Sequence, residues 1–328
     1  MKNELLSLED ASRRIESGAV MTIAGDAALL AQLPRGSWIG GTSVYFVTET
    51  GGAMIRDRLY CTTFDEVTRA DIRVLDADAL PRLSDGHQPG GFSFILIPAF
   101  GKAHAAFAME GQTYPGVFDQ PLVGWVAGVH LDEIGESAPM VFDGTTGTAH
   151  GDAAVVMHLA LAAGAVPSVD IVNIFSQPGA DAPALRFTTT GFGASSALVD
   201  GVETALATYL REQGIDTRLP LIANYGGALI NVSIRDVDAD TGAVAFYAPV
   251  MEGVEYRFAR PLADYAGAFA DRSGAGGAGQ YSCNCILNYV HGELEGKPTG
   301  GFTGPVTFGE IAYMLLNQTL VRLDLTAA

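Results

Sequence analysis

Two cysteines separated by one residue are the first candidates for chemistry in this sequence. Cys283 and Cys285 lie in the last third of the chain, and His291 follows them. A cysteine nucleophile needs a base beside it, and His291 with Glu310 or Glu293 would supply one. One hypothesis is therefore an enzyme that uses Cys283 or Cys285 as its nucleophile.

The same side chains allow two other interpretations. A metal or haem could bind through His291 or a cysteine, but a zinc site takes about four ligands and the chain has no second cysteine pair. Free cysteine is also a common small residue of protein cores, and we favour that interpretation. The sequence therefore predicts no catalytic residue, no metal ligand and no named cofactor.

Small and polar residues around the cysteines predict a binding site. Glycine, asparagine, threonine and one acid cluster in residues 282–289, 300–311 and 317–321, between apolar runs. Such a cluster is costly in a simple core, because buried polar groups need partners and glycine loses backbone entropy. In the first half, Gly40 and Gly41 either let backbone amides approach a ligand or form a tight turn.

Composition predicts a globular protein and argues against two classes of partner. The 328 residues are 48% hydrophobic, enough for one large or two medium cores. There are 37 acidic residues against 19 basic ones, and the net charge of −18 repels phosphate backbones and anionic membrane surfaces. No apolar run approaches the roughly 20 residues of a membrane span. We expect no nucleic-acid partner and no membrane insertion.

Cysteine usage and the first residues predict a cytoplasmic protein of bacterial type. The three cysteines, an odd number, favour a reducing compartment. Residues 1–10 lack the charged and then apolar profile of a secretion signal.

Periodicity predicts a mixed α+β fold, with two strand-rich halves of largely antiparallel sheet flanked by helices. Residues 92–98 are apolar almost throughout and predict a buried strand, followed by a helix over residues 103–110. A second helix is predicted over residues 195–213 from apolar residues that recur every four positions, Leu198, Val202, Leu206 and Leu210. Pro167, after a Gly/Ala-rich stretch, suggests domains of residues 1–165 and 166–328.

Motifs near the end of the chain carry a family resemblance. Residues 307–311 read Thr-Phe-Gly-Glu-Ile, residues 316–321 read Leu-Asn-Gln-Thr-Leu-Val, and residues 282–283 read Ser-Cys. In the first half, residues 38–43 read Trp-Ile-Gly-Gly-Thr-Ser. Together these segments resemble the FIST family, the F-box and intracellular signal transduction proteins, whose members carry an N-terminal and a C-terminal FIST domain in tandem.

The resemblance spans about residues 29–323 and indicates a divergent branch. The family's basic residue shortly after the cysteine is replaced here by Asn284-Cys285-Ile286. The resemblance implies a sensory, non-catalytic protein that binds a small molecule, such as an amino acid or a related metabolite. Because the chain carries no output domain, it would signal through a separate partner protein or act alone.

We expect the ligand to lie between the two halves, against ten residues. They are Gly40, Gly41, Thr42, Ser43, Cys283, Asn284, Cys285, Asn288, Thr303 and Glu310. Glu310 has two alternative roles: it pairs with a ligand amine, or it accepts hydrogen bonds from loop amides. In the second case Glu310 and Asn317 both satisfy buried backbone N–H groups.

Overall fold

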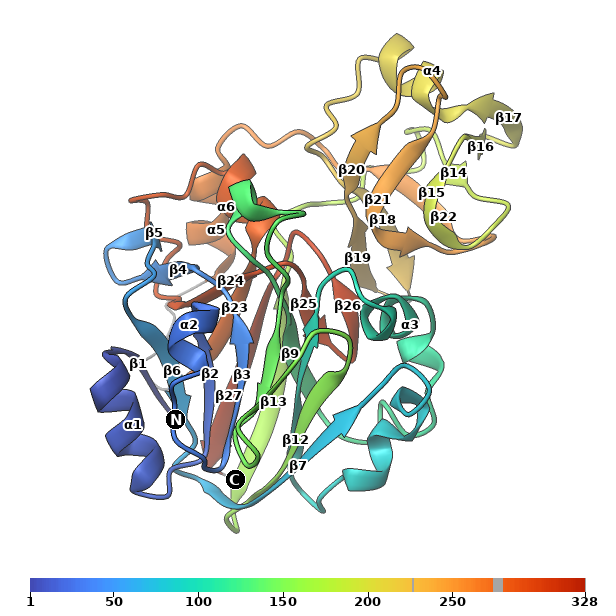
Figure 1. Cartoon of the computed structure of the whole chain (residues 1–328). Helices are drawn as coiled ribbons and strands as arrows, with labels where there is room; N and C mark the ends of the chain where they lie inside the picture. The colour runs from blue at the N-terminus through green and yellow to red at the C-terminus, as the bar shows by residue number, and fades with distance from the viewer. Residues whose placement is uncertain (226, 274–279, 328) are drawn as a thin grey trace.

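The computed structural model describes residues 1–225, 227–273 and 280–327. Strands make up 43% of the chain and helices 17%, so the predicted α+β class is confirmed, with sheets dominating. Figure 1 shows a large body and a smaller lobe. We define the lobe as residues 185–258 and the body as the rest of the described chain.

The first sheet of the body is built entirely from the first half of the chain. Its order is β1 (Lys2–Leu6), β6 (Leu59–Thr63), β2 (Met21–Gly25), β3 (Trp38–Thr42), β10 (Val141–Asp143) and β11 (Thr148–His150). Helices α1 (Leu8–Glu16) and α2 (Ala27–Leu30) pack on it.

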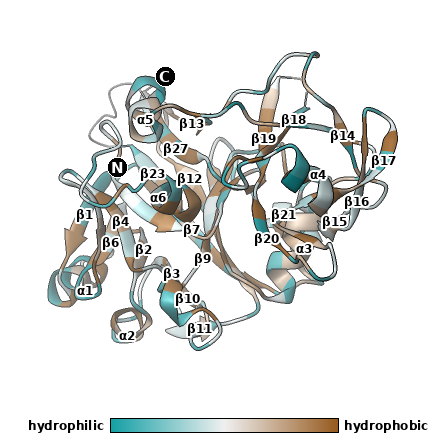
Figure 2. Ribbon diagram, turned by 90° about the horizontal axis from the view of Figure 1, so that it is seen from above, coloured by the Kyte–Doolittle hydropathy of each residue, from teal (hydrophilic) through white to brown (hydrophobic). Residues whose placement is uncertain are grey.

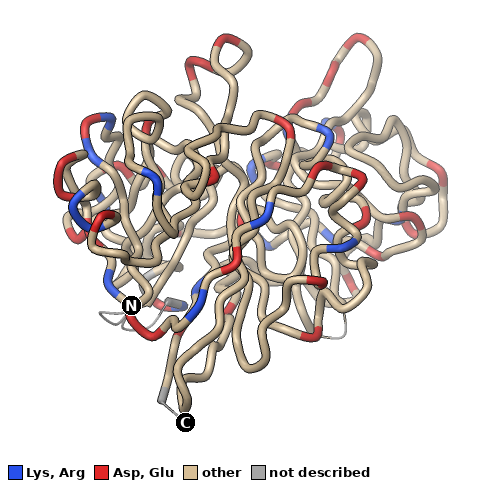
Figure 3. Tube along the Cα trace, turned by 60° about the horizontal axis from the view of Figure 1, so that its bottom comes forward, with Lys and Arg blue, Asp and Glu red and all other residues tan. Residues whose placement is uncertain are grey.

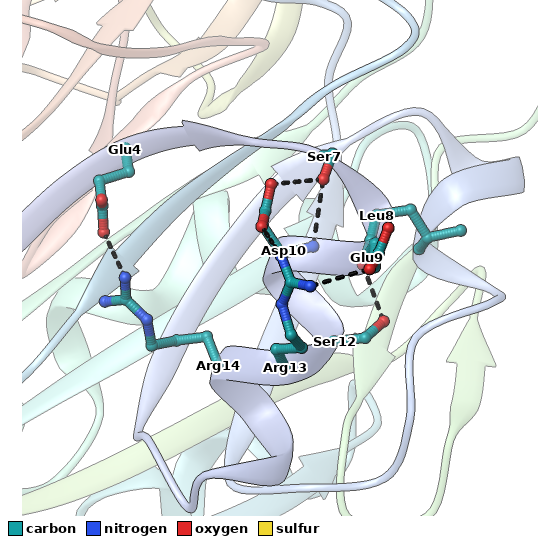
Figure 4. Close-up of polar contacts among 8 residues, drawn as sticks. All are labelled: Glu4, Ser7, Leu8, Glu9, Asp10, Ser12, Arg13 and Arg14. Carbon is teal, nitrogen blue, oxygen red and sulfur yellow. Dashed lines mark hydrogen bonds and ion pairs between the residues drawn. The ribbon is translucent and has the colours of Figure 1, made fainter.

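The N-terminus of α1 illustrates how local sequence fixes an element. Ser7 precedes the helix, and its hydroxyl accepts a hydrogen bond from the Asp10 backbone N–H at 3.1 Å, which satisfies one of the free amides of the first turn. Arg13 pairs with Glu9 and Asp10 one turn earlier (Figure 4). Ala11 and Ile15 are buried against the sheet.

The second and third sheets combine strands from both halves. The second sheet runs β26 (Met314–Leu316), β25 (Glu310–Ala312), β9 (Leu122–Ala127), β8 (Phe92–Pro98), β12 (Ala154–Leu161), β7 (Val67–Leu75). The third runs β13 (Ala165–Val172), β27 (Leu320–Ala327), β23 (Tyr281–Cys285), β24 (Gly304–Thr307), β4 (Tyr45–Thr48), β5 (Gly51–Met54). Because β25 pairs with β9 and β24 with β4, the expected division at residues 165/166 does not separate the sheets.

One hydrophobic cluster joins the three sheets of the body. It contains Ile39 from the first sheet, Phe94 and Trp125 from the second, and Phe46 and Tyr281 from the third, all buried. Phe94 contacts both Trp125 and Tyr281 edge to face, an arrangement that aromatic rings favour. The predicted strand over residues 92–98 is confirmed as β8, buried along its whole length, and the predicted helix after it is confirmed as α3 (Lys102–Glu110).

The lobe has a hydrophobic core of its own. One sheet contains β17 (Val202–Ala205), β16 (Ser196–Val199), β14 (Leu185–Arg186), β22 (Glu255–Phe258), β18 (Leu221–Tyr225) and β19 (Ala228–Val232). A smaller sheet contains β15 (Gly191–Ala194), β21 (Val244–Val250) and β20 (Ile234–Val237). Helix α4 (Leu206–Glu212) buries Leu206 and Leu210 in the core of the lobe. The chain returns to the body through α5 (Tyr265–Ser273) and, after β23, α6 (Ile286–His291).

The helix predicted over residues 195–213 is wrong in its first half. Leu198 and Val202 lie in the hairpin of β16 and β17, and only residues 206–212 are helical. The hairpin turns at Asp200-Gly201, whose φ angles are 48° and 85°. A two-residue Asp-Gly turn with positive φ at both positions joins antiparallel strands, so turn chemistry overrides the four-residue spacing.

Hydrophobic and charged residues are distributed over the whole architecture. Figure 2 shows hydrophobic and hydrophilic residues on both strands and helices. Figure 3 shows acidic residues spread over both body and lobe. No helix in the described residues is long and apolar enough to cross a membrane.

We expect Gly124→Ala to destabilise the protein by roughly 1–3 kcal/mol. Gly124 pairs with Ile95 across the parallel strands β8 and β9, and a methyl group on Gly124 would overlap the Ile95 carbonyl oxygen. Chemical unfolding measures the effect. Gly151→Ala is the control, because a methyl group there meets nothing within 4 Å; equal stabilities for the two variants would contradict this account of β9.

Candidate functional site

A cavity of about 450 Å³ lies where the lobe meets the body. The body contributes the turn from β8 into α3, residues 131–134 and the segment from Cys285 through α6. The lobe contributes side chains from β15, β20 and β21. In Figure 1 the lobe stands above α3, with α6 on the other side of its base. Sites between structural units are a common place for small ligands.

The turn from β8 into α3 places one wall of the cavity. Phe100 has a φ of 69°, an uncommon backbone conformation for a bulky residue, and its side chain lines the cavity. Gly101 cannot cap α3, but Asp152 accepts hydrogen bonds from the Lys102 and Ala103 backbone N–H groups in its place. The turn is thereby fixed, and the first turn of α3 brings His104 to the cavity.

Cys285 is the predicted site residue that lines this cavity. It ends β23, pairs with Thr307 of β24, and donates its backbone N–H to the Thr319 carbonyl at 3.2 Å. Cys283 lies two residues earlier, inside the core of the body, with its thiol 3.6 Å from the Gly124 carbonyl oxygen. Both are free thiols.

Burial raises the pKa of both thiols. The pKa of Cys285 is raised well above its ordinary value, first by loss of solvation and then by the neighbouring Glu310. The same two causes raise the pKa of Cys283. Because the thiolate is the nucleophilic form, both cysteines are poorly reactive in this setting.

Glu310 is fully buried and fastens the closing segment of the chain. Its Oε2 accepts hydrogen bonds from the Thr319 backbone N–H at 3.2 Å and the Thr319 hydroxyl at 2.7 Å. Its Oε1 has no partner of ordinary geometry in the described residues, although the Cys285 thiol lies beside the carboxyl group. Burial raises the pKa of Glu310 to about 8. Of the two predicted roles, the bonds to a backbone amide are the one observed.

Asn317 plays the matching role at the lobe, as expected. Its Oδ1 accepts the Ser233 backbone N–H at 3.0 Å, which identifies the other side-chain atom as Nδ2. Asn317 lines the cavity, is only 3% exposed, and its Nδ2 has no partner in the described part of the chain.

Asn284 and Asn288 belong to a buried network behind the cavity. Asn288 donates to the Asn284 side-chain oxygen at 2.8 Å and to the Thr319 carbonyl at 3.0 Å. It accepts the Tyr265 hydroxyl proton at 2.7 Å. These bonds join α6, β23, α5 and the residue that precedes β27, so the two asparagines support the cavity wall without lining it.

The other predicted residues have structural neighbours away from the cavity. Gly40 and Gly41 lie against Trp38 and Trp125. The other three, Thr42, Ser43 and Thr303, bond respectively to the Met140 backbone N–H, the Val306 carbonyl and the Tyr60 hydroxyl. None of the five lines the cavity.

The predicted ligand contacts did not include His104, Arg235 and Asn317, which are polar residues that line the cavity. His104 follows shortly after the predicted buried strand of residues 92–98. A polar residue just beyond the end of a buried strand is a signal from which His104 could have been predicted. Arg235 gives no local signal, because its position depends on how the lobe folds back over the body.

A metal centre finds no support among residues 1–225, 227–273 and 280–327. No group of three or more histidine, cysteine or acidic side chains in these ranges is placed to hold a metal ion.

Comparison with protein families assigns the chain to one family. The model of a family of unknown function, DUF6976, matches residues 6–326. The chain belongs to the DUF6976 family. The matched range contains both body and lobe, so the whole cavity lies within the DUF6976 region. A search of curated proteins finds no match.

Glu310→Gln should change how stability depends on pH. The folded protein holds a proton on Glu310 up to about pH 8, whereas an unfolded chain with the ordinary pKa of 4.5 releases it. Unfolding therefore releases a proton between these values, and stability falls as pH rises through them. Relative to wild type, the variant should gain on the order of 1.4 kcal/mol per pH unit across that window.

Urea unfolding at several pH values measures this difference. Glu49→Gln, on the exposed turn between β4 and β5, is the control and should follow wild type. Parallel stability curves for wild type and Glu310→Gln would show that Glu310 is charged in the folded protein.

Proposed function

We propose that this DUF6976 protein binds a small molecule in the cavity between lobe and body and serves as a sensory module. The observation that carries the proposal is the unpartnered Nδ2 of Asn317, buried and lining a cavity of about 450 Å³. A buried donor without an acceptor costs free energy, which a ligand would recover. The sequence resemblance to FIST proteins supports the same kind of function.

The sensory part of the proposal depends on the position of the cavity. Its lining includes Phe192, Phe246 and Tyr247 from the lobe, and Cys285 and Phe308 from the body. A ligand that contacts both units favours the arrangement in which both sets of contacts are made. The lobe orientation would then report occupancy to a separate partner protein in the cytoplasm.

Catalysis by a cysteine is the less favoured alternative. Cys285 and His291 both line the cavity, but no hydrogen bond joins them in the described residues. Burial lowers the pKa of His291 and raises that of the Cys285 thiol, so neither group is prepared to form a thiolate and imidazolium pair.

A bulky residue in the cavity should block binding. Ala105 is an exposed residue of α3 that lines the cavity, so Ala105→Trp adds volume there without disturbing the core. Thermal-shift measurements against amino acids, carboxylates, amides and amines at millimolar concentration should find a class that stabilises wild type. Ala105→Trp should lose that shift.

Ala31→Trp, at an exposed position after α2, is the matched control and should retain the shift. Native mass spectrometry of freshly purified protein adds a test that does not depend on the panel. A panel without any shift, together with a native mass equal to that of the bare chain, would reject the proposal.

The cysteine hypothesis predicts fast alkylation, and we expect the opposite. At neutral pH, iodoacetamide should label Cys285 more slowly than free cysteine, because the reactive thiolate is scarce. Peptide mapping separates Cys61, Cys283 and Cys285. Labelling of Cys285 faster than free cysteine would restore the enzyme hypothesis.

A further inference from the structure

Two buried donors without a partner in the described residues line the cavity. Besides Asn317 Nδ2, the His104 ring offers a second one: its Nδ1 accepts the Phe100 backbone N–H at 3.4 Å, so the ring proton sits on Nε2. That Nε2 is buried and has no partner in the described residues. Burial lowers the pKa of His104 to about 4, which keeps the ring neutral and Nε2 a donor at pH 7.

Arg235 adds a positive charge to the same cavity. It lies on β20 of the lobe, is exposed, and makes no ion pair or side-chain hydrogen bond within the described ranges. A guanidinium is permanently charged and can bind a carboxylate through two parallel hydrogen bonds. Ten other basic side chains of the chain, by contrast, already have acidic partners: Lys2, Arg13, Arg14, Arg56, Arg73, Arg186, Arg218, Arg257, Lys297 and Arg322.

Acidic side chains are absent from the described lining of the cavity. The chain as a whole has 37 acidic residues, so the cavity differs from the rest of the surface. Asp236 follows Arg235 but does not line the cavity, and Glu310 bonds to Thr319 behind it. A ligand ammonium would therefore find no carboxylate here, whereas a ligand anion meets no repulsion from the walls.

The remaining walls are apolar and largely aromatic. They include Phe100, Leu131, Ile134, Phe192, Phe246 and Phe308. Walls of this kind bind the hydrocarbon part of a ligand, while a few polar groups fix its orientation. Because only one of the donors carries a full charge, a singly charged head group matches the cavity better than a phosphate dianion.

We infer that the cavity binds a small monocarboxylate with an aliphatic or aromatic body, its carboxylate held by Arg235, His104 and Asn317. This inference rests on the proposed binding function and narrows it to one class of ligand. It selects against amines and against amino acids, whose ammonium group would lie unpaired among apolar walls.

Matched probes test the inference directly. Octanoate and 3-phenylpropanoate should bind wild type in isothermal titration calorimetry at pH 7, about tenfold or more tighter than octanamide and 3-phenylpropanamide. 3-Phenylpropylamine should not bind. Arg235→Ala should weaken both acids by about tenfold and leave any amide binding unchanged, since only the acids use the charge.

Arg211→Ala is the matched control, because Arg211 is another exposed lobe arginine that does not line the cavity. Acids that bind no tighter than their amides, or that bind Arg235→Ala as they bind wild type, would overturn the carboxylate inference and leave the binding function standing. If none of the probes binds, the inference is also overturned, and native mass spectrometry decides the proposed function separately.

Discussion

The pairing of late strands with early ones is the constraint on which the rest of the structure depends. β25 lies beside β9, and β24 lies beside β4, so the last third of the chain completes sheets that the first third begins. This pairing places Glu310 next to Cys285, and the bonds from Glu310 to Thr319 then fix the entry into β27. The strand pairing of the body thus determines the position of the cavity wall that contains Cys285.

Local signals predicted the elements with strong patterns and failed where two signals competed. The apolar run of residues 92–98 and the helix after it were correct, because a strand buried on both faces leaves an unbroken hydrophobic stretch. The helix over residues 195–213 was half wrong, because Asp200-Gly201 fixes a hairpin turn that the apolar spacing does not reveal. Turn residues deserved more weight than periodicity there.

The site could be predicted from the sequence only where its residues come from one region of the chain. Cys285, Glu310 and the asparagines of residues 284–288 come from one polar cluster, and the structure keeps them close. His104, Arg235 and Asn317 lie far apart along the chain and meet at one cavity because the lobe folds back over the body. Composition and residue spacing do not predict that these three side chains lie close together, since their proximity depends on tertiary packing.

The interior position of β27 in its sheet also affects how the protein can be made. β27 lies between β13 and β23, so the third sheet stays incomplete until residues 320–327 have left the ribosome. During synthesis one backbone edge of β9 and one of β4 stay unpaired until β25 and β24 have been made. Strands of other chains can pair with such open edges. Such long-range pairing slows folding. Newly made chains therefore expose strand edges until the late strands of the chain have been synthesised.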